Sequence, residues 1–371
     1  MKKTRFGLPG YLGVAAVWFA THAGGGFCTG RQGVEYYVRY GRSALWTPFF
    51  AMAICAVVYA VAWEICRVYK VYNYRAMADE LYRPYNLLFS NIFEIGYLLT
   101  VILASAAGLA ACGHLLDQLF GLSYIPGLLI TAAGVLVIAQ YGARALRNAS
   151  SVMSVVIITL LIIVMVYLIP ATAPNRAQVV ATVNNPGWQW KAVLYAAFQL
   201  IGIAAYAPVS DVLQTRSDVI RAAFWGFVLN AAILWGITYT LLGCYPAVVK
   251  EALPLLSGIK QLGAGFAWLV TVYSLMLYAG NLSTVVSFSF GMIHRIEASS
   301  LGKSTLFSNV AVGRWVVGGV LLAICLGIGQ FGLIPIVAKG YPLLGYFGIA
   351  GVLIPVLTLG LSKIKEASAK S

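Results

Sequence analysis

The first long apolar segment of the chain, from about residue 8 to residue 40, is interrupted by Ala20-Thr-His-Ala-Gly-Gly-Gly-Phe-Cys-Thr-Gly-Arg-Gln32. Each of the three consecutive glycines disfavours a continuous helix by about 1 kcal/mol relative to alanine. Inside a bilayer the freed backbone groups have no water to bond, so such a break is tolerated only where protein or a wet cavity covers it. The stretch therefore predicts a broken membrane helix whose outer half starts near Phe27.

A broken helix of this kind presents free N–H groups and a positive dipole end to whatever fills the gap. We expect Gly24, Gly25, Gly26 and Phe27 to line a substrate site in which the N–H groups face an anionic group. The alternative is structural, because small residues also let two helices pack closely.

Composition places the whole chain in a membrane. Of its 371 residues, 61% are hydrophobic and 10% are charged, and the mean hydropathy is +0.85. Repeated apolar runs of about 20 residues predict an all-α polytopic membrane protein with no separate soluble domain. We predict ten membrane segments, at about 8–40, 44–70, 85–112, 125–142, 150–170, 188–216, 220–244, 264–296, 310–330 and 341–362. A short amphipathic piece is expected around residues 247–259.

The net charge of +14 raises the possibility of nucleic acid as a partner, but its distribution argues against it. Most lysines and arginines fall in short loops and tails on one side of the ten segments, as the positive-inside rule requires. The sequence therefore predicts a cell-membrane protein, plasma or inner, with cytoplasmic N- and C-termini. Its other partners would be the lipid bilayer and a small-molecule substrate.

The sixth segment carries a second interruption signal. Pro208 removes a backbone donor, and Ser210 and Asp211 are suitable N-caps for a new half-helix. We expect a break near Tyr206–Ser210, with an ordinary proline kink as the alternative. Interrupted helices at matching positions of two halves are typical of inverted-repeat transporters. We therefore expect one transporter domain over residues 1–371, with repeats at about 8–170 and 188–362.

The run Gly24-Gly-Gly-Phe-Cys-Thr-Gly-Arg-Gln32 resembles the glycine-rich motif in the first helix of YkvI-type membrane proteins. These belong to the amino acid–polyamine–organocation superfamily, which has the LeuT-like fold of five plus five helices. The resemblance implies transport of an amino acid or a related small amine or carboxylate. This chain departs from the usual motif at His22 and Cys28 and carries Arg31 just beyond it.

The resemblance also implies a sodium site between the first and eighth segments. Its ligands would be the carbonyls of Ala20, Ala23 and Gly280 and the hydroxyls of Ser283 and Thr284. Gly280, Ser283 and Thr284 share one helix face. The alternative is that the hydroxyls simply bond back to carbonyls of their own helix.

Ionisable residues at membrane depth are candidates for function. Glu94 is a candidate for proton or substrate binding, with a salt bridge near the inner face as the alternative. His22 lies at the break and is a candidate for substrate or proton binding, or for capping broken-helix carbonyls. Asp211 is either a simple N-cap or a group that attracts a substrate cation. Arg31 and Glu35, spaced i, i+4, are expected to form an ion pair.

Tyr97, Phe198 and Tyr206 are candidates to close over a substrate. The sequence shows no metal-ligand spacing, nucleophile motif or phosphate loop, so we expect no enzyme activity and no cofactor beyond a coupling ion, Na⁺ or H⁺. A disulfide between Cys112 and Cys244 is conceivable, and the oligomeric state stays open. The sequence thus favours an ion-coupled secondary transporter of a small amino-acid-like solute, with an uncoupled channel or a non-transporting sensor as alternatives.

Overall fold

The protein is described here from a computed structural model that covers residues 9–22, 25–141, 143–297, 300–304 and 307–370. These residues form helices joined by short connections and contain no strand. The N-terminal half comprises α1 (Gly10–His22), α2 (Gly25–Cys28), α3 (Arg31–Tyr36), η1 (Val38–Leu45), α4 (Thr47–Tyr69), α5 (Tyr74–Tyr82), α6 (Asn86–Phe120), α7 (Tyr124–Tyr141), α8 (Ala143–Ala171) and α9 (Ala173–Thr182).

The C-terminal half has a similar alternation of long and short helices. It comprises α10 (Trp188–Leu200), α11 (Ile203–Tyr206), η2 (Ala207–Val212), α12 (Arg216–Leu242), η3 (Ala247–Lys250), α13 (Pro254–Lys260), η4 (Ala264–Phe266), α14 (Ala267–Glu297), η5 (Ser300–Lys303), α15 (Val310–Gly329), α16 (Leu333–Pro335), η7 (Ile336–Gly340), α17 (Tyr341–Gly348), η8 (Ile349–Leu353), η9 (Val356–Gly360) and α18 (Leu361–Lys370).

The observed spans match the predicted membrane segments closely. Seven helices in the described part of the chain are long and apolar enough to cross a bilayer, and an eighth joins if the pair α8 and α9, bent by 76°, counts as one span. The shorter apolar helix α7 and the interrupted α1–α3 account for the other two predicted segments. The protein is a multi-pass helical membrane protein.

The first segment is broken as expected, but its outer half differs from the prediction. Instead of one half-helix starting near Phe27, the chain forms α2 and α3, separated by Gly30 in the left-handed conformation with φ 82°. A Cβ at Gly30 would lie 2.9 Å from a methyl carbon of Leu241 and 3.0 Å from Leu255 Cγ. Only glycine both adopts this φ readily and fits against those two side chains.

The sixth segment is interrupted earlier than predicted. The α-helical hydrogen-bond pattern is interrupted at Ile201–Gly202, between α10 and α11, where both residues keep helical φ and ψ angles, and Trp188–Val212 remains one apolar span. Pro208 lies near the start of the 3₁₀ turn η2, directly after α11 ends at Tyr206. Gly202 allows the close packing there, because a Cβ would lie 2.9 Å from the Gln199 carbonyl oxygen and 3.0 Å from the Tyr206 hydroxyl.

The expected caps at Ser210 and Asp211 are also replaced. Both residues lie within η2, and no new half-helix begins there. The next helix, α12, begins at Arg216 with a capping box, in which the Thr215 hydroxyl accepts from the Asp218 N–H and the Asp218 carboxylate accepts from the Thr215 N–H. Such a box satisfies two N–H groups that a helix N-terminus otherwise leaves free.

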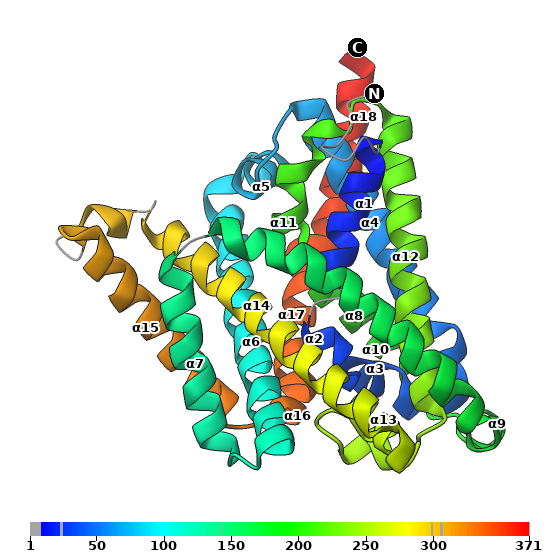
Figure 1. Ribbon diagram of the computed structural model, residues 1–371. Coiled ribbons are helices and arrows are strands. Elements are labelled where there is room, and N and C mark those ends of the chain that lie inside the picture. Colours follow the sequence, from blue (N-terminus) through cyan, green and yellow to red (C-terminus); the bar gives the residue numbers. More distant parts are fainter. Residues whose placement is uncertain (1–8, 23–24, 142, 298–299, 305–306, 371) are drawn as a thin grey trace.

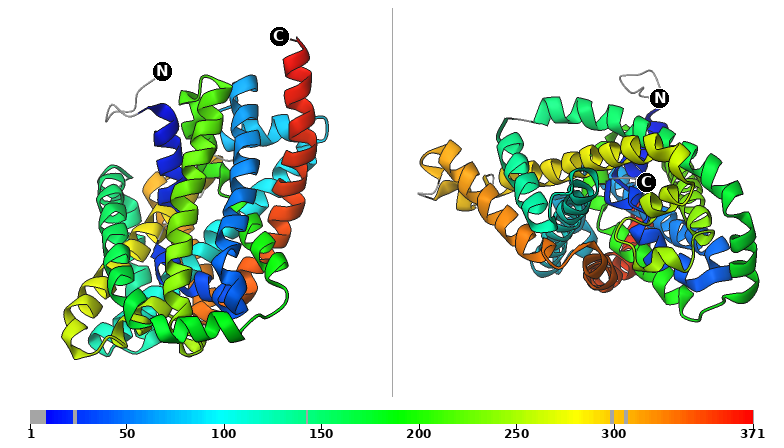
Figure 2. Two further views of the ribbon diagram at one scale, coloured as in Figure 1. Left: turned by 90° about the vertical axis from the view of Figure 1, so that its right-hand side faces the viewer. Right: turned by 60° about the horizontal axis from the view of Figure 1, so that its bottom comes forward.

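Two groups of helices build the molecule. In one, α12 packs on α1 and α4, and α4 packs on α10; in the other, α6 packs on α7, α14 and α15. Figure 1 shows the second group on the left, with α14 crossing the molecule diagonally, and the first group upright on the right. Figure 2 shows the start of α1 and the end of α18 at the same end of the molecule, called the termini side below.

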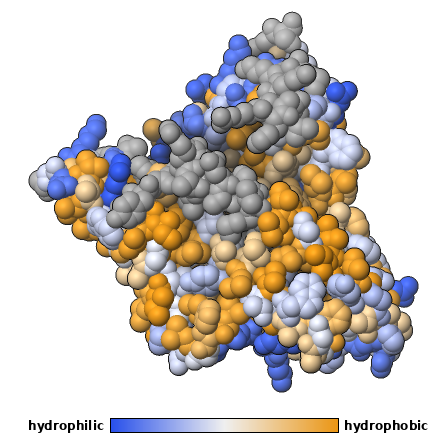
Figure 3. All heavy atoms as spheres, viewed as in Figure 1, coloured by the Kyte–Doolittle hydropathy of each residue, from blue (hydrophilic) through white to orange (hydrophobic). Residues whose placement is uncertain are grey.

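The surface fits a bilayer. Large apolar side chains on the long helices point outward, including Leu87, Val166 and Phe224, each more than half exposed. Figure 3 shows apolar residues covering much of one face, with hydrophilic residues gathered at its lower edge and its upper end. Lipid tails cover such a surface without unfavourable exposure of apolar area to water.

The suggested disulfide between Cys112 and Cys244 is absent. Both residues are buried free cysteines. The Cys112 thiol lies 3.8 Å from the Tyr278 carbonyl oxygen on α14, and Cys244 lies in the connection after α12.

Candidate functional site

A cavity of about 130 Å³ lies where the two interrupted segments meet the second group of helices. Residues flanking both breaks line it, together with one face of α6, one face of α14 and the start of α17. The lining residues are Thr21, His22, Phe27, Gln32, Tyr97, Thr100, Val101, Ala104, Gly108, Phe198, Gln199, Ile201, Gly202, Ala205, Tyr206, Asn281, Thr284, Phe288, Tyr341 and Leu344.

His22, the last residue of α1, lies at the first break and makes hydrogen bonds to side chains of α12 and α10. Its Nδ1 lies 2.7 Å from the Asn230 side-chain oxygen on α12, and its Nε2 lies 2.7 Å from the Tyr195 hydroxyl on α10. The Asn230 amide nitrogen donates to the Gly226 carbonyl, which orients its oxygen toward His22. Nδ1 therefore carries a proton, and in the neutral ring Nε2 is an acceptor that faces the Tyr195 hydroxyl, which also lies 3.4 Å from Gln32 Oε1.

Aromatic rings close the cavity on the side away from the termini. Phe198 packs with Tyr195, Tyr341 and Tyr36 at ring-centroid distances of 5.0, 5.0 and 5.8 Å. Tyr36 and Tyr195 are fully buried, and Phe198 is 7% exposed. These rings separate the cavity from the loops at the end of the molecule away from the termini.

A buried ion cluster around Glu35 lies beyond these rings, on the side of them away from the cavity. The Glu35 carboxylate contacts Arg31, Arg39 and Lys191 at 3.2, 3.3 and 3.2 Å. Arg31 is fully buried and also donates to the backbone carbonyls of Val249 and Glu251, at 2.8 and 3.0 Å. The predicted Arg31–Glu35 ion pair is present within α3. The Lys191–Glu35 pair joins α3 to α10, and the Arg31 bonds to Val249 and Glu251 join it to the connection after α12.

On the termini side the cavity continues toward a second hollow of about 130 Å³. The two share Tyr97, Val101 and Phe288, and the second also borders Tyr74 and Arg295. The cavity is thus bordered by packed rings on one side and by a second hollow on the other.

Glu94 lies beside this second hollow, in a cluster that joins α5, α6 and α14. Its carboxylate pairs with Arg295 and with Arg75, the latter at 3.1 Å, and accepts from the Tyr74 hydroxyl at 3.3 Å. Burial, and secondarily the charge of Glu94, raises the pKa of Tyr74 to about 12, so this hydroxyl keeps its proton. The arrangement is the salt bridge given above as the alternative for Glu94.

The structure brings together some of the predicted site residues and separates others. His22, Phe27, Tyr97, Phe198 and Tyr206 line the cavity, whereas Glu94 and Asp211 do not. Asp211 is exposed on η2. Gly25 and Gly26 lie in α2, next to the cavity-lining Phe27. Gly24 lies outside the described residues.

The predicted sodium ligands are spread over two helices. Ala20 lies on α1, and Gly280, Ser283 and Thr284 lie on α14, while Ala23 is outside the described residues. Thr284 lines the cavity, and its hydroxyl donates to the Gly280 carbonyl at 2.9 Å. This bond within α14 is the alternative to sodium binding that was given above. It places the Thr284 hydroxyl oxygen next to the Gly280 carbonyl oxygen.

Sequence reasoning missed the amide side chains of the cavity, Gln32, Gln199 and Asn281. Gln32 ends the quoted motif and Asn281 follows Gly280, so position in the chain was an available signal for both. Gln199 directly follows Phe198, which was named from the sequence, but no signal of its own marked it.

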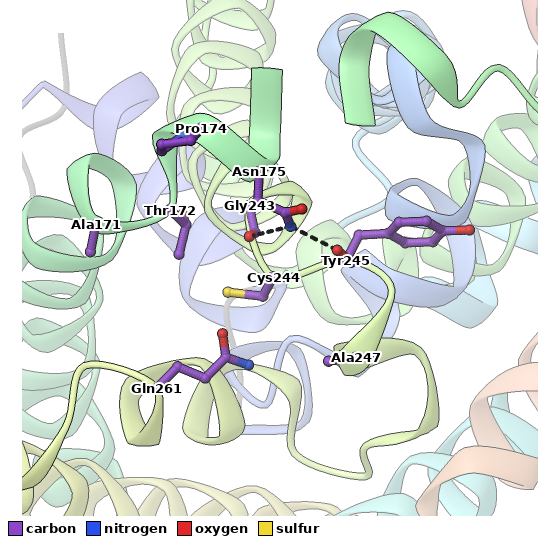
Figure 4. Close-up of a pocket in the computed structure, with 9 residues that line it drawn as sticks. All are labelled: Ala171, Thr172, Pro174, Asn175, Gly243, Cys244, Tyr245, Ala247 and Gln261. Atoms are coloured by element: carbon purple, nitrogen blue, oxygen red, sulfur yellow. Dashed lines mark hydrogen bonds between the residues drawn. The ribbon is translucent and has the colours of Figure 1, made fainter. Parts of the chain in front are cut away.

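A separate hollow of about 440 Å³ lies on the side away from the termini, at the bend between α8 and α9. Figure 4 shows Asn175 directed toward the backbone carbonyls of Gly243 and Tyr245, to which its amide donates at 2.8 and 2.7 Å. These bonds fix the α8–α9 bend to the end of α12. They use both amide protons of Asn175 in structural contacts.

Comparison with solved structures decides the fold. MhsT in complex with L-phenylalanine superposes with a TM-score of 0.64, covering 96% of this chain and 98% of that one at 12% identity. The chain has the LeuT-like fold. A Na⁺-coupled sialic acid symporter in a substrate-bound outward-open state superposes with a TM-score of 0.62, covering 95% of this chain and 79% of that one at 13% identity.

Among curated proteins, the chain is similar to YkvI, an uncharacterized membrane protein of Bacillus subtilis (strain 168). The two are 22% identical over 343 residues, covering 91% of this chain and 92% of that protein. No protein-family model matches the chain. The LeuT-like fold, with its first and sixth segments interrupted, confirms the predicted fold class.

Proposed function

We propose that this protein is an ion-coupled secondary transporter of a small amino-acid-like solute. One observation carries the proposal: a cavity lined by residues flanking both helix breaks and by α6 and α14. Irregular backbone at membrane depth is tolerated where it lines a solute cavity, and paired broken helices mark the binding site in inverted-repeat transporters. The solute would lie between the two groups of helices.

Alternating access would follow from movement of one group against the other. The group containing α1, α4, α10 and α12 would rock against the group containing α6, α7, α14 and α15. The conformation seen here corresponds to closure on the side away from the termini, which the proposal places outside the cell, with both termini cytoplasmic. Reopening that side would require the aromatic closure around Phe198 and the Glu35 cluster to separate.

The coupling ion is proposed to be Na⁺, held between the first break and α14. Gly280 and Thr284 offer two neighbouring oxygens, the ligand type that hard cations prefer. Replacing Ser283 and Thr284 together by alanine should remove the dependence of transport on sodium. Unchanged sodium dependence would exclude this site, and dependence on pH in its place would identify H⁺ as the coupling ion.

Uphill accumulation tests the proposal. Purified protein is reconstituted into liposomes and supplied with labelled neutral L-amino acids under an inward sodium gradient, an inward proton gradient or neither. The proposal expects accumulation above the external concentration with one gradient and only exchange with neither. Downhill equilibration under every condition would identify a facilitator, and binding without any flux would identify a sensor.

A further inference from the structure

The side-chain oxygen of Asn281 is a buried acceptor without a donor among the described residues. Asn281 lies on α14 and is fully buried. Its amide nitrogen donates to the Leu277 carbonyl at 2.8 Å, one turn earlier. That bond fixes the orientation of the amide, and the oxygen on its other arm has no hydrogen-bond partner. A buried acceptor left in this state is unfavourable and calls for an explanation.

The unpartnered oxygen belongs to the wall of the cavity. Asn281 lines the cavity together with Gly108 of α6. A Cβ built on Gly108 would lie 3.8 Å from the Asn281 oxygen, so this oxygen is directed toward the α6 face that borders the cavity. The acceptor therefore lies buried in the cavity wall between α14 and α6.

The rest of the described lining offers hydrogen bonds but no formal charge. It contains amides at Gln32 and Gln199 and hydroxyls on threonine and tyrosine, with no Asp, Glu, Lys or Arg. Both ring nitrogens of His22 already have protein partners. Apart from the proposed coupling ion, a solute with a net charge would lose its hydration here without gaining a charged partner from the described lining, which is unfavourable.

We infer that the transported solute carries no net charge and presents an N–H donor that the Asn281 side-chain oxygen accepts. This inference rests on the proposed function and narrows its substrate class. A zwitterionic amino acid meets both conditions, because its two charges compensate each other and its ammonium group carries the donors. A simple amine cation or a simple carboxylate does not.

Thermal stability of the purified full-length protein tests the inference, because a ligand that binds the folded state raises the unfolding temperature. The neutral L-amino acids and N-acetyl-L-leucine amide are screened first. The best amino acid is then compared with three analogues that change one property each. For L-leucine these are its N,N,N-trimethyl betaine without N–H donors, the cation 3-methylbutylamine and the anion 4-methylpentanoate.

The inference expects the parent to bind about tenfold to a hundredfold more tightly than each analogue, the range set by losing one hydrogen bond to a charged group. Equal binding of the betaine would overturn the role of the N–H donor. Equal or tighter binding of either charged analogue would overturn the requirement for no net charge. A screen in which no net-neutral compound stabilises the protein would overturn the inference as a whole.

Variants at Asn281 separate the role of its oxygen from general damage. Asn281→Leu should keep or raise the unfolding temperature of the ligand-free protein, because it removes an unsatisfied acceptor, while losing the response to the parent. Asn281→Asp should gain a response to 3-methylbutylamine. Thr271→Ala, at an exposed position on the same helix, serves as the control and should respond like the wild type. If Asn281→Leu retained the full response, the oxygen would have no role in binding.

The failure of this inference is distinguishable from the failure of the proposed function. Selective binding of net-neutral compounds with N–H donors, without flux in liposomes, would support the inference and contradict the proposed transport function. Uphill transport with no preference among the four matched compounds would support the proposed transport function and contradict the inference.

Discussion

Glu35 is the residue whose loss should most clearly weaken the closed side of the molecule. Its carboxylate is 5% exposed and contacts three cationic side chains, of which Arg31 is fully buried. Glu35→Gln keeps the size of the side chain but removes its charge. Breaking a buried ion pair by removing one partner costs about 3–5 kcal/mol, because the other charge stays buried.

The structure places the expected effect at the lower end of that range. Arg31 keeps two backbone acceptors, the carbonyls of Val249 and Glu251, so its charge is not left without hydrogen bonds. We expect Glu35→Gln to raise the free energy of the closed conformation by about 3 kcal/mol. If the opened conformation is not affected equally, its population should rise by roughly a hundredfold.

Two assays measure these effects. Denaturation of the purified protein gives the change in stability. Glu297→Gln is the control, because Glu297 pairs with the partly exposed Arg314 and such pairs contribute about 0–1 kcal/mol. Opening is measured by the rate at which a membrane-impermeant thiol reagent labels Cys28, a fully buried residue at the end of α2, just before α3, which carries Glu35. Faster labelling is expected only in Glu35→Gln. Equal effects of both variants, or unchanged labelling, would refute the view that the Glu35 cluster holds this side closed.

Three further predictions concern packing and hydrogen bonds. Gly348→Ala should destabilise the protein by about 1–3 kcal/mol in thermal unfolding, because the added Cβ would lie 2.0 Å from a carbonyl oxygen of α10. Gly134→Ala is the control and should leave the stability unchanged, because no atom lies within 4 Å of a Cβ there. Asn230→Leu should cost about 1–3 kcal/mol, because the buried His22 Nδ1–H loses its acceptor; a value near zero would contradict the assigned tautomer. Thr215→Ala should cost about 1 kcal/mol and increase hydrogen exchange in the first turn of α12, and unchanged exchange there would contradict the capping box.

Much of the fold could be predicted because bilayer thickness imposes a strong constraint on sequence. Apolar runs of about 20 residues located the membrane segments, and three consecutive glycines located the first break. These are local signals, readable without knowing what packs against what. The same local signals placed His22 and Phe27 at the first break, and both residues line the cavity.

The position of the second break could not be read in the same way. Pro208 and the cap-forming Ser210 were the visible signals, but the helix is interrupted at Gly202, where the Tyr206 hydroxyl packs closely. Pro208 is accommodated because it lies near the start of a 3₁₀ turn, where its missing N–H is not needed. Pro208 therefore indicated the correct segment but not the correct position of the interruption within it.

The site was predictable in its aromatic residues but not in its polar contacts. His22 and Asn230 are 208 residues apart in the chain, and Glu94 and Arg295 are 201 apart. Pairings at such separations depend on tertiary packing, so the choice between a substrate role and a salt bridge for Glu94 could not be made from its neighbours in sequence. The cavity amides were missed for the same reason.

The most direct test of the central claim is to fill the cavity and measure transport. Ala104 lines the cavity on α6, and Ile138 lies on α7 with 41% of its surface exposed. Ala104→Trp and Ile138→Trp are reconstituted in parallel with the wild type, and gradient-driven uptake of labelled neutral L-amino acids is measured after both variants are shown to be folded. The proposal predicts uptake by the wild type and Ile138→Trp and none by Ala104→Trp. Equal uptake by both variants, or no uptake by the wild type under any gradient, would contradict it.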